Sequence, residues 1–176
     1  VDLARPTSWM QATTIREANG TETPLPTFER HLLCDEQGLF PEDFNSWEGE
    51  VVRAELGRSG TVAWYRNPSR ASQDSLGIIY DDGGEPKIVR PDFVFFGQQG
   101  DGTFTADIVD PHGIQFGDAI PKLKGLAQYA ERFGDQYRRI DAVAKIGDTF
   151  RVLDLKEAAT RAAVLAATSI KALYEG

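Results

Sequence analysis

The sequence has few of the residues that hold small domains together by covalent or metal cross-links. It contains one cysteine and two histidines in 176 residues. Because Cys34 has no partner for an internal disulfide, a reducing compartment, the cytoplasm, is the expected location. His31 lies three residues before Cys34, but the second half of a zinc site is missing, since only one other histidine exists. A chain of this length can bury a sufficient core without such support.

Long apolar runs are also missing. No window approaches the roughly 18 consecutive apolar residues of a membrane span, and no apolar signal core opens the chain. We therefore expect no membrane segment. The chain starts with Val1 where a native start has methionine, which favours a processed product or a fragment of a longer chain.

Positive charge is in deficit, with 19 Lys and Arg against 27 Asp and Glu, a formal net charge of −8. This balance argues against binding nucleic acid by bulk electrostatics, because phosphate contacts require a local excess of Lys and Arg. Two small basic clusters remain, Arg66 with Arg70 and Arg138 with Arg139. The alternative for each arginine is solvated surface charge.

The most informative part of the chain is a pair of β-rich segments. Apolar residues run from Phe93 to Phe96 and from Phe104 to Val109, and the glycine-rich stretch between them is typical of a turn. The pattern predicts a β-hairpin. Asp92 and Asp110 then lie together at the end of the hairpin away from the turn.

Strand geometry also sorts the side chains of the second segment. Because side chains alternate with period two, Asp110 and His112 are expected on one face of the sheet and Asp107 on the other. Two acids and one nitrogen base are therefore expected to converge.

Pro91-Asp92 on one strand and Asp110-Pro111-His112 on the next resemble the core motif of the PD-(D/E)xK nuclease family. That motif is Pro-Asp followed by Asp or Glu, any residue, and Lys. The departure is at His112, where the family has lysine.

Three further segments, 64–68, 74–80 and 122–130, resemble the C-terminal nuclease-like domain of DEAD/DEAH helicases and of the restriction subunits of type III systems. The resemblance covers about residues 28–174. It implies a restriction-endonuclease-like core, DNA as substrate, and an ATP-dependent helicase motor in the same longer chain. A modification subunit is a further partner that it implies.

Phosphodiester hydrolysis by such a nuclease needs carboxylates that hold Mg²⁺ or Mn²⁺. The resemblance implies Asp92 and Asp110 as metal ligands, with the backbone carbonyl of Pro111. It also implies an acid from the first helix, with Glu50 as first choice and Glu48 as second. The alternative for both glutamates is a solvated helix face.

His112 differs chemically from the lysine it replaces, because a histidine with a reference pKa of about 6.5 is mostly neutral at neutral pH. A neutral imidazole could accept a proton from the attacking water or ligate Mn²⁺, while adjacent carboxylates would raise its pKa and keep it charged. If charge is needed, Lys122 or Lys124 from the following helix could supply it. The alternative for both lysines is a surface position.

A second Asp-x-Lys stands at Asp154-Leu155-Lys156. Its place at a strand-to-helix junction, with Glu157 three residues after Asp154, predicts a helix N-cap with a capping box. We therefore assign this aspartate a structural role.

The periodicity predicts one α/β domain with a central mixed β-sheet flanked by helices, over residues 28–176, after an arm or linker over residues 1–27. Expected helices are 46–56, with Ser46 as cap, 120–133, and one closing helix from 155 to 173; expected strands are 61–66, 77–80, 88–96, 103–110, 140–146 and 149–153.

The expected function is a metal-dependent DNA endonuclease domain, with Arg66 and Arg70 contacting nucleic acid. Two alternatives stay open. One is a catalytically inactive domain of the same fold that contacts DNA or packs on the motor. The other is an unrelated α/β domain in which the motif is a coincidence, since fold-level analogy alone does not assign function.

Overall fold

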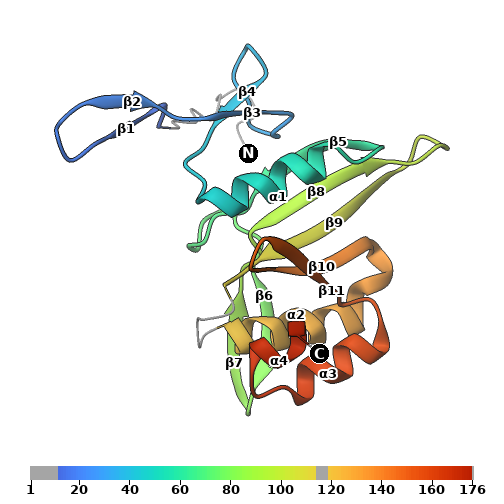
Figure 1. Ribbon diagram of the computed structural model, residues 1–176. Helices are drawn as coiled ribbons and strands as arrows, with labels where there is room; N and C mark the ends of the chain where they lie inside the picture. Colours follow the sequence, from blue (N-terminus) through green and yellow to red (C-terminus); the bar gives the residue numbers. More distant parts are fainter. Residues whose placement is uncertain (1–11, 114–118, 176) are drawn as a thin grey trace.

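The computed structural model describes residues 12–113 and 119–175 (Figure 1). Its main sheet has five strands in the order β11-β10-β9-β8-β5. The bounds are β5 Thr61–Arg66, β8 Phe93–Gln98, β9 Phe104–Pro111, β10 Tyr137–Ile146 and β11 Thr149–Asp154. Strands β9 and β10 are parallel and the other neighbours are antiparallel, so the sheet is mixed.

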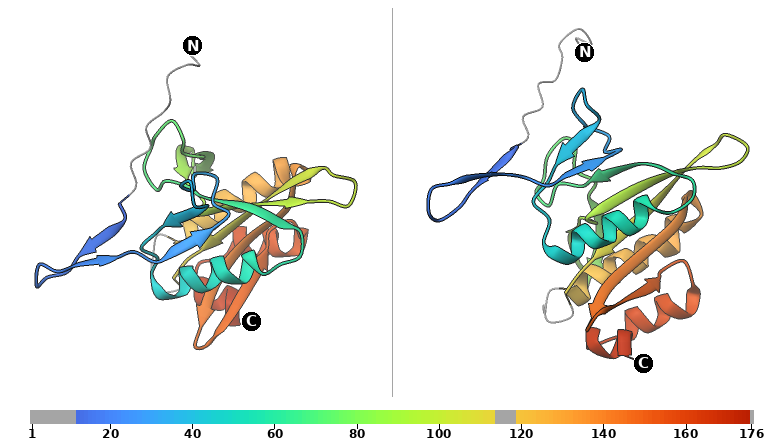
Figure 2. Two further views of the ribbon diagram at one scale, coloured as in Figure 1. Left: turned by 90° about the horizontal axis from the view of Figure 1, so that it is seen from above. Right: turned by 45° about the horizontal axis from the view of Figure 1, so that its top comes forward.

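Helices cover both faces of this sheet (Figures 1 and 2). They are α1 Ser46–Leu56, α2 Ala119–Phe133, a 3-10 turn at Gly134–Gln136, α3 Ala158–Ala166 and α4 Ile170–Glu175. Helix α1 lies on one face, and α2, α3 and α4 lie on the other. The predicted α/β class with a central mixed sheet flanked by helices is therefore confirmed.

Each face of the sheet has its own hydrophobic core. On the α1 side, Val52 packs with Trp64 and with alternate residues of the strands, among them Phe93 and Val109. Val52 is fully buried, and a side chain of this kind contributes about 1.5–3 kcal/mol by its burial.

The core on the α2 side follows from the helix pattern. Leu123, Leu126, Ala127 and Ala130 recur at helical spacing and are all buried against the sheet. Ile108 of β9 belongs to this core. Strand parity therefore directs alternate residues of β9 to opposite sides of the sheet, as predicted.

A β-hairpin outside the main sheet packs along α2. It is formed by β6, Ile78–Asp82, and β7, Glu85–Val89. The ring of Tyr80 approaches so closely that a Cβ at Gly125 would lie 2.7 Å from it. Only glycine fits at this position of the helix.

Two more hairpins precede the main sheet. Strands β1, Thr14–Arg16, and β2, Glu22–Pro24, form the first, which extends away from the rest of the chain (Figure 2). Strands β3, Thr27–Glu29, and β4, Leu39–Pro41, form the second. The first hairpin lies within the residues for which the sequence predicted an arm or linker.

Two predicted elements are divided in the structure. The strand expected over 88–96 is split between β7 and β8, because Pro91 has no N–H to donate to a sheet. The closing helix is split between α3 and α4, because Ala167 is extended, with φ −68° and ψ 141°. The serine and threonine that follow it favour helix caps over helix interiors.

Both predicted helix caps were wrong. Asn45, not Ser46, caps α1, and it forms a capping box with Glu48. Helix α3 begins after Glu157, which makes no side-chain capping bond. Asp154 instead ends β11, and its Oδ1 accepts a hydrogen bond from the backbone N–H of Lys156 at 2.8 Å. This local turn satisfies the aspartate without a helix.

None of the helices in the described ranges is long and apolar enough to cross a membrane.

Candidate active site

The structure brings Asp92 and Asp110 together at the end of the β8–β9 hairpin away from its turn. Phe93 pairs with Val109 in the antiparallel register. Asp92, which precedes Phe93, therefore lies opposite Asp110, which follows Val109. The backbone N–H of Asp92 donates to Asp110 Oδ1 at 3.0 Å. The predicted convergence of these two residues is confirmed.

Lys122 reaches the same place from the first turn of α2. Its Nζ lies 2.7 Å from Asp110 Oδ1 and 3.6 Å from Asp92 Oδ2. Lys124, on the same helix, makes no ion pair with either carboxylate. We call Asp92, Asp110 and Lys122 the carboxylate pair site, in which one ammonium faces two carboxylates.

Burial sets the electrostatics of this site. Burial, followed by the charge of Asp110, raises the pKa of Asp92 to about 6 against the opposing effect of Lys122. Burial also raises the pKa of Asp110, which Lys122 only partly offsets. Burial lowers the pKa of Lys122, but the two carboxylates outweigh it and the net shift is upward. The site is therefore short of positive charge.

One oxygen of the pair has no hydrogen-bond partner. Asp110 is fully buried, and its Oδ2 accepts no hydrogen bond from any residue that the structure describes. His112 Nδ1 is 3.8 Å from this oxygen, beyond hydrogen-bond distance. A buried carboxylate oxygen without a partner is costly, and a bound cation is one of the ways in which proteins satisfy it. The donor set therefore fits a divalent cation that prefers oxygen ligands.

His112 lies beside the pair, but both of its ring nitrogens are engaged. Nδ1 is 3.2 Å from the backbone carbonyl oxygen of Asp110, and Nε2 is 2.9 Å from the hydroxyl oxygen of Tyr174. Because a carbonyl can only accept, Nδ1 carries the proton and Nε2 accepts from the tyrosine. Burial lowers the pKa of His112 to about 4. Of the two protonation states that the sequence left open for His112, the neutral one agrees with this shift, because desolvation outweighs the effect of the carboxylates.

Arg66 lies near the pair, and its charge lowers the pKa of both aspartates. Its Nη1 is 3.2 Å from Glu48 Oε1, and its guanidinium lies 4.8 Å from the centre of the Phe93 ring. Glu48 is thus an ion-pair partner as well as part of the α1 cap. Arg70 is exposed and forms no ion pair with the residues that the structure describes.

Glu50, the first choice for a helix ligand, is not brought to the pair. Its carboxylate binds Nζ of Lys145 on β10 at 3.0 Å. Lys145 shares strand parity with Val143, which belongs to the core on the α1 side. Asp110 shares parity with Ile108, which faces α2. The sheet therefore separates Glu50 from Asp110.

Asn67 is a site residue that the sequence did not reveal. It is buried, and its Nδ2 donates to the carbonyl oxygens of Pro91 and Leu76 at 2.7 and 3.0 Å. Its Oδ1 accepts from the N–H of Leu76 at 2.7 Å, and its own N–H donates to the carbonyl of Asp92 at 2.9 Å. Asn67 therefore fastens the loop after β5 to the segment that carries Asp92.

A cavity of about 300 Å³ opens beside the pair. Asp92 and Lys122 lie on its wall, and the remaining lining residues are Ser69, Tyr80, Ile88, Val89 and Arg90. Pro111, the predicted carbonyl ligand, is buried directly after Asp110 at the end of β9.

The YagJ family model matches residues 29–176. Protein YagJ of Escherichia coli (strain K12) is 47% identical over 174 residues, which cover 99% of this chain and 71% of the relative. The chain belongs to the YagJ family. No solved structure matches it, and neither name states an activity.

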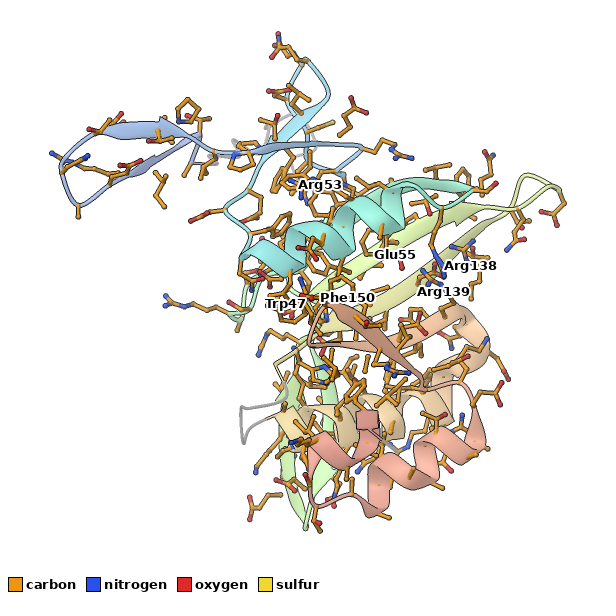
Figure 3. The ribbon with its side chains drawn as sticks, viewed as in Figure 1. Trp47, Arg53, Glu55, Arg138, Arg139 and Phe150 are labelled. Atoms are coloured by element: carbon orange, nitrogen blue, oxygen red, sulfur yellow. The ribbon has the colours of Figure 1, made fainter. Side chains whose placement is uncertain are left out.

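This YagJ family member has a second buried charge cluster, on the α1 side of the sheet. We call it the arginine network: Asp107, Glu55 and Asp141 with Arg138 and Arg139 (Figure 3). Arg138 Nε lies 3.0 Å from Asp107 Oδ1, and Arg139 Nη2 lies 2.9 Å from Asp107 Oδ2. Arg139 also binds Glu55 at 2.6 Å and Asp141 at 3.0 Å. Both arginines therefore form ion pairs with carboxylates of the same chain.

The carboxylate pair provides fewer than three side-chain ligands. Within the described ranges, no group of three or more His, Cys, Asp or Glu residues is arranged to hold a metal ion. A cation at this site of the YagJ fold would therefore depend on backbone oxygens, water or substrate for its other ligands, as is common for Mg²⁺.

Proposed function

We propose that this YagJ family member is a metal-dependent nuclease that hydrolyses phosphodiester bonds in DNA. The observation that carries this proposal is the unpartnered oxygen of buried Asp110 beside Asp92. A charge-deficient carboxylate pair next to a cavity is typical of a functional site, since a purely structural ion pair is normally neutralised.

The order of elements supports the same proposal. Helix α1 is followed by the antiparallel strands β5, β8 and β9, then by α2 and the parallel strand β10. This is the order of a restriction-endonuclease-like core that the resemblance to PD-(D/E)xK nucleases implied. The likeness is one of fold, so the site carries the functional argument.

Asp92 and Asp110 would hold Mg²⁺ or Mn²⁺, and the carbonyl of Pro111 stands next to them in the chain. When bound, the cation would supply positive charge to the phosphate and lower the pKa of a water molecule. Both ions prefer the oxygen ligands present here.

Lys122 would perform the task that the motif assigns to lysine. Its ammonium stays protonated at neutral pH, because the two carboxylates hold its pKa above the ordinary value. It would place fixed positive charge near the scissile phosphate, where charge develops in the reaction. His112 is neutral, and its two hydrogen bonds give it a positioning role at the backbone of Asp110.

The test is cleavage of supercoiled plasmid and of single-stranded DNA with Mg²⁺, Mn²⁺ or EDTA. We expect metal-dependent cleavage that is lost in both Asp92→Asn and Asp110→Asn. Asp154→Asn is the matched control, because it changes the exposed aspartate of the second Asp-x-Lys motif. Cleavage that survives in both pair variants would refute the proposal.

A second candidate is a catalytically inactive nuclease fold that only contacts DNA. The position of Lys122 favours it, since its ammonium already lies within ion-pair distance of both carboxylates. DNA binding without cleavage at any metal concentration would support this candidate. The association with an ATP-dependent motor or a modification subunit stays a prediction, and pull-down of such a chain with this domain would test it.

A further inference from the structure

The cavity beside Asp92 and Lys122 has two kinds of wall. Arg90, Lys122 and Ser69 supply cationic and hydroxyl groups, while Tyr80, Ile88 and Val89 supply an aromatic and aliphatic surface. Its volume of about 300 Å³ is at the lower end of the range for small-ligand sites. A ligand that fits both walls has an anionic part and a flat or apolar part.

Arg90 is held in place but has no carboxylate partner. Its Nε donates to the hydroxyl of Ser75 at 2.9 Å, and that hydroxyl lies 3.3 Å from the carbonyl oxygen of Pro68. Among the described residues, no Asp or Glu forms an ion pair with Arg90, whereas Arg138 and Arg139 are both occupied. An anchored guanidinium with free N–H groups matches the geometry of a phosphate.

The loop that provides Ser69 is also fixed by hydrogen bonds before any ligand binds. Asn67 ties both ends of the loop together through Leu76 and fastens them to Pro91. A ligand in the cavity would therefore spend little free energy on ordering this wall.

The apolar wall is formed mainly by the β6–β7 hairpin. Ile88 is 53% exposed, while Val89 and Tyr80 are buried beneath it. An exposed aliphatic side chain next to a cation can pack against the base of a nucleotide whose phosphate binds the arginine. The cavity has room for one nucleotide and not for a base pair.

We infer that this cavity binds one unpaired nucleotide, with its phosphate at Arg90 and Lys122 and its base against Ile88. This rests on the proposed nuclease function and assigns its substrate class. The enzyme would act on single-stranded DNA, or on a duplex with an unpaired nucleotide at a flap or an end. A nucleotide placed here would present its phosphodiester to Asp92 and Asp110.

The first experiment measures binding in EDTA, so that it does not depend on cleavage. Fluorescein-labelled dT12 and a blunt 12-base-pair duplex are compared by anisotropy, and unlabelled dTMP and inorganic phosphate are used as competitors. We expect dT12 to bind at least tenfold more tightly than the duplex, and dTMP to compete better than phosphate. Equal binding of dT12 and the duplex, or equal competition by phosphate and dTMP, would overturn the inference.

Matched variants locate the site. Arg90→Gln is expected to weaken dT12 binding by roughly tenfold to 100-fold, the size of lost hydrogen bonds to a charged group. Ile88→Ala is expected to weaken it several-fold. Ile79→Ala is the control, because Ile79 pairs with Ile88 across the hairpin but does not line this cavity. Arg151→Gln, on the exposed edge strand β11, is the control for charge.

The two hypotheses fail in different ways. Unchanged dT12 binding in Arg90→Gln, with metal-dependent cleavage intact in the parent protein, would refute the nucleotide site alone. Selective dT12 binding that depends on Arg90, without any cleavage, would support the nucleotide site and refute the nuclease proposal. Melting curves of each variant show whether it is folded before either conclusion is drawn.

Discussion

Asp107 and Asp110 lie three residues apart on strand β9, both are fully buried, and they have opposite electrostatic surroundings. Asp107 faces α1, and both of its oxygens accept hydrogen bonds from guanidinium groups. Asp110 faces α2 and shares one lysine with Asp92, and one of its oxygens has no partner in the described chain. Strand parity alone therefore sends two aspartates of one strand to different kinds of site.

The two clusters differ in how completely their carboxylates are hydrogen-bonded. Burial of charge is common to both, so burial is not the criterion. The arginine network is closed, because its guanidinium groups satisfy the carboxylates they touch. The carboxylate pair site is open, because one buried oxygen of Asp110 has no hydrogen-bond partner among the described residues. We expect an open cluster of this kind, and not a closed one, to bind a cation.

Asp107→Asn is expected to destabilise the protein most, because it disrupts the closed cluster. The substitution removes a fully buried carboxylate that accepts hydrogen bonds from both Arg138 and Arg139. Half-buried Arg138 then loses its carboxylate partner among the described residues, while Arg139 keeps Glu55 and Asp141. We expect the free energy of unfolding to fall by about 3–5 kcal/mol. Urea denaturation measures it, with exposed Asp148→Asn as control. A loss below about 1 kcal/mol would show that the arginine network is not structural.

The next effect tests the open cluster. Asp110→Asn should reduce cleavage by about 100-fold or more, the scale of losing a main electrostatic group of an active site. The free energy of unfolding should change by only about 1 kcal/mol, because Asn can still accept from the N–H of Asp92 and a costly buried charge is removed. Plasmid nicking and urea denaturation of one preparation measure both. Equal destabilisation by Asp107→Asn and Asp110→Asn would show that the two aspartates do not differ in structural role.

His112 lies beside the open cluster, but we expect its role to be structural, because both of its ring nitrogens are hydrogen-bonded. His112→Phe keeps an aromatic ring but removes the hydrogen bonds of the histidine with the hydroxyl of Tyr174 and with the carbonyl of Asp110. We expect a loss of about 1–3 kcal/mol in the free energy of unfolding. In Tyr174→Phe the loss should be smaller, and the two changes together should be less than additive. Loss of cleavage in His112→Phe without loss of stability would instead indicate a catalytic base.

The smallest effect is the pH dependence of metal affinity. Burial raises the pKa of Asp92 to about 6, with the charge of Asp110 as the next cause. The carboxyl is protonated below this pH and must lose the proton to bind a cation, so affinity should fall as pH decreases below 6. One proton gives about a tenfold change per pH unit. Calorimetric titration with Mn²⁺ measures it, and Asp92→Asn should make the slope shallower, because only the carboxyl of Asp110 is then left to titrate.

Some of the site was predictable because it depends on local geometry. Alternation along a strand and a glycine-rich turn suffice to place Asp92 and Asp110 at one end of a hairpin and Asp107 on the opposite face. These relations need no knowledge of the rest of the fold.

The remaining site residues depend on packing between distant segments. The choice between Lys122 and Lys124 depends on how α2 rotates as its apolar stripe packs, and the choice between Glu48 and Glu50 depends on how α1 sits on the sheet. Asn67 was invisible because its amide binds the carbonyl of Pro91, 24 residues away in sequence. No local pattern encodes such a contact.

The close approach of Tyr80 to Gly125 has a mechanical consequence. The hairpin that carries Ile88 and the helix that carries Lys122 are in direct contact here, because the tyrosine ring occupies the space that a side chain at Gly125 would fill. A substitution such as Gly125→Ala would push both apart at once. The distance between Ile88 and the ammonium of Lys122 therefore depends on the absence of a Cβ at Gly125.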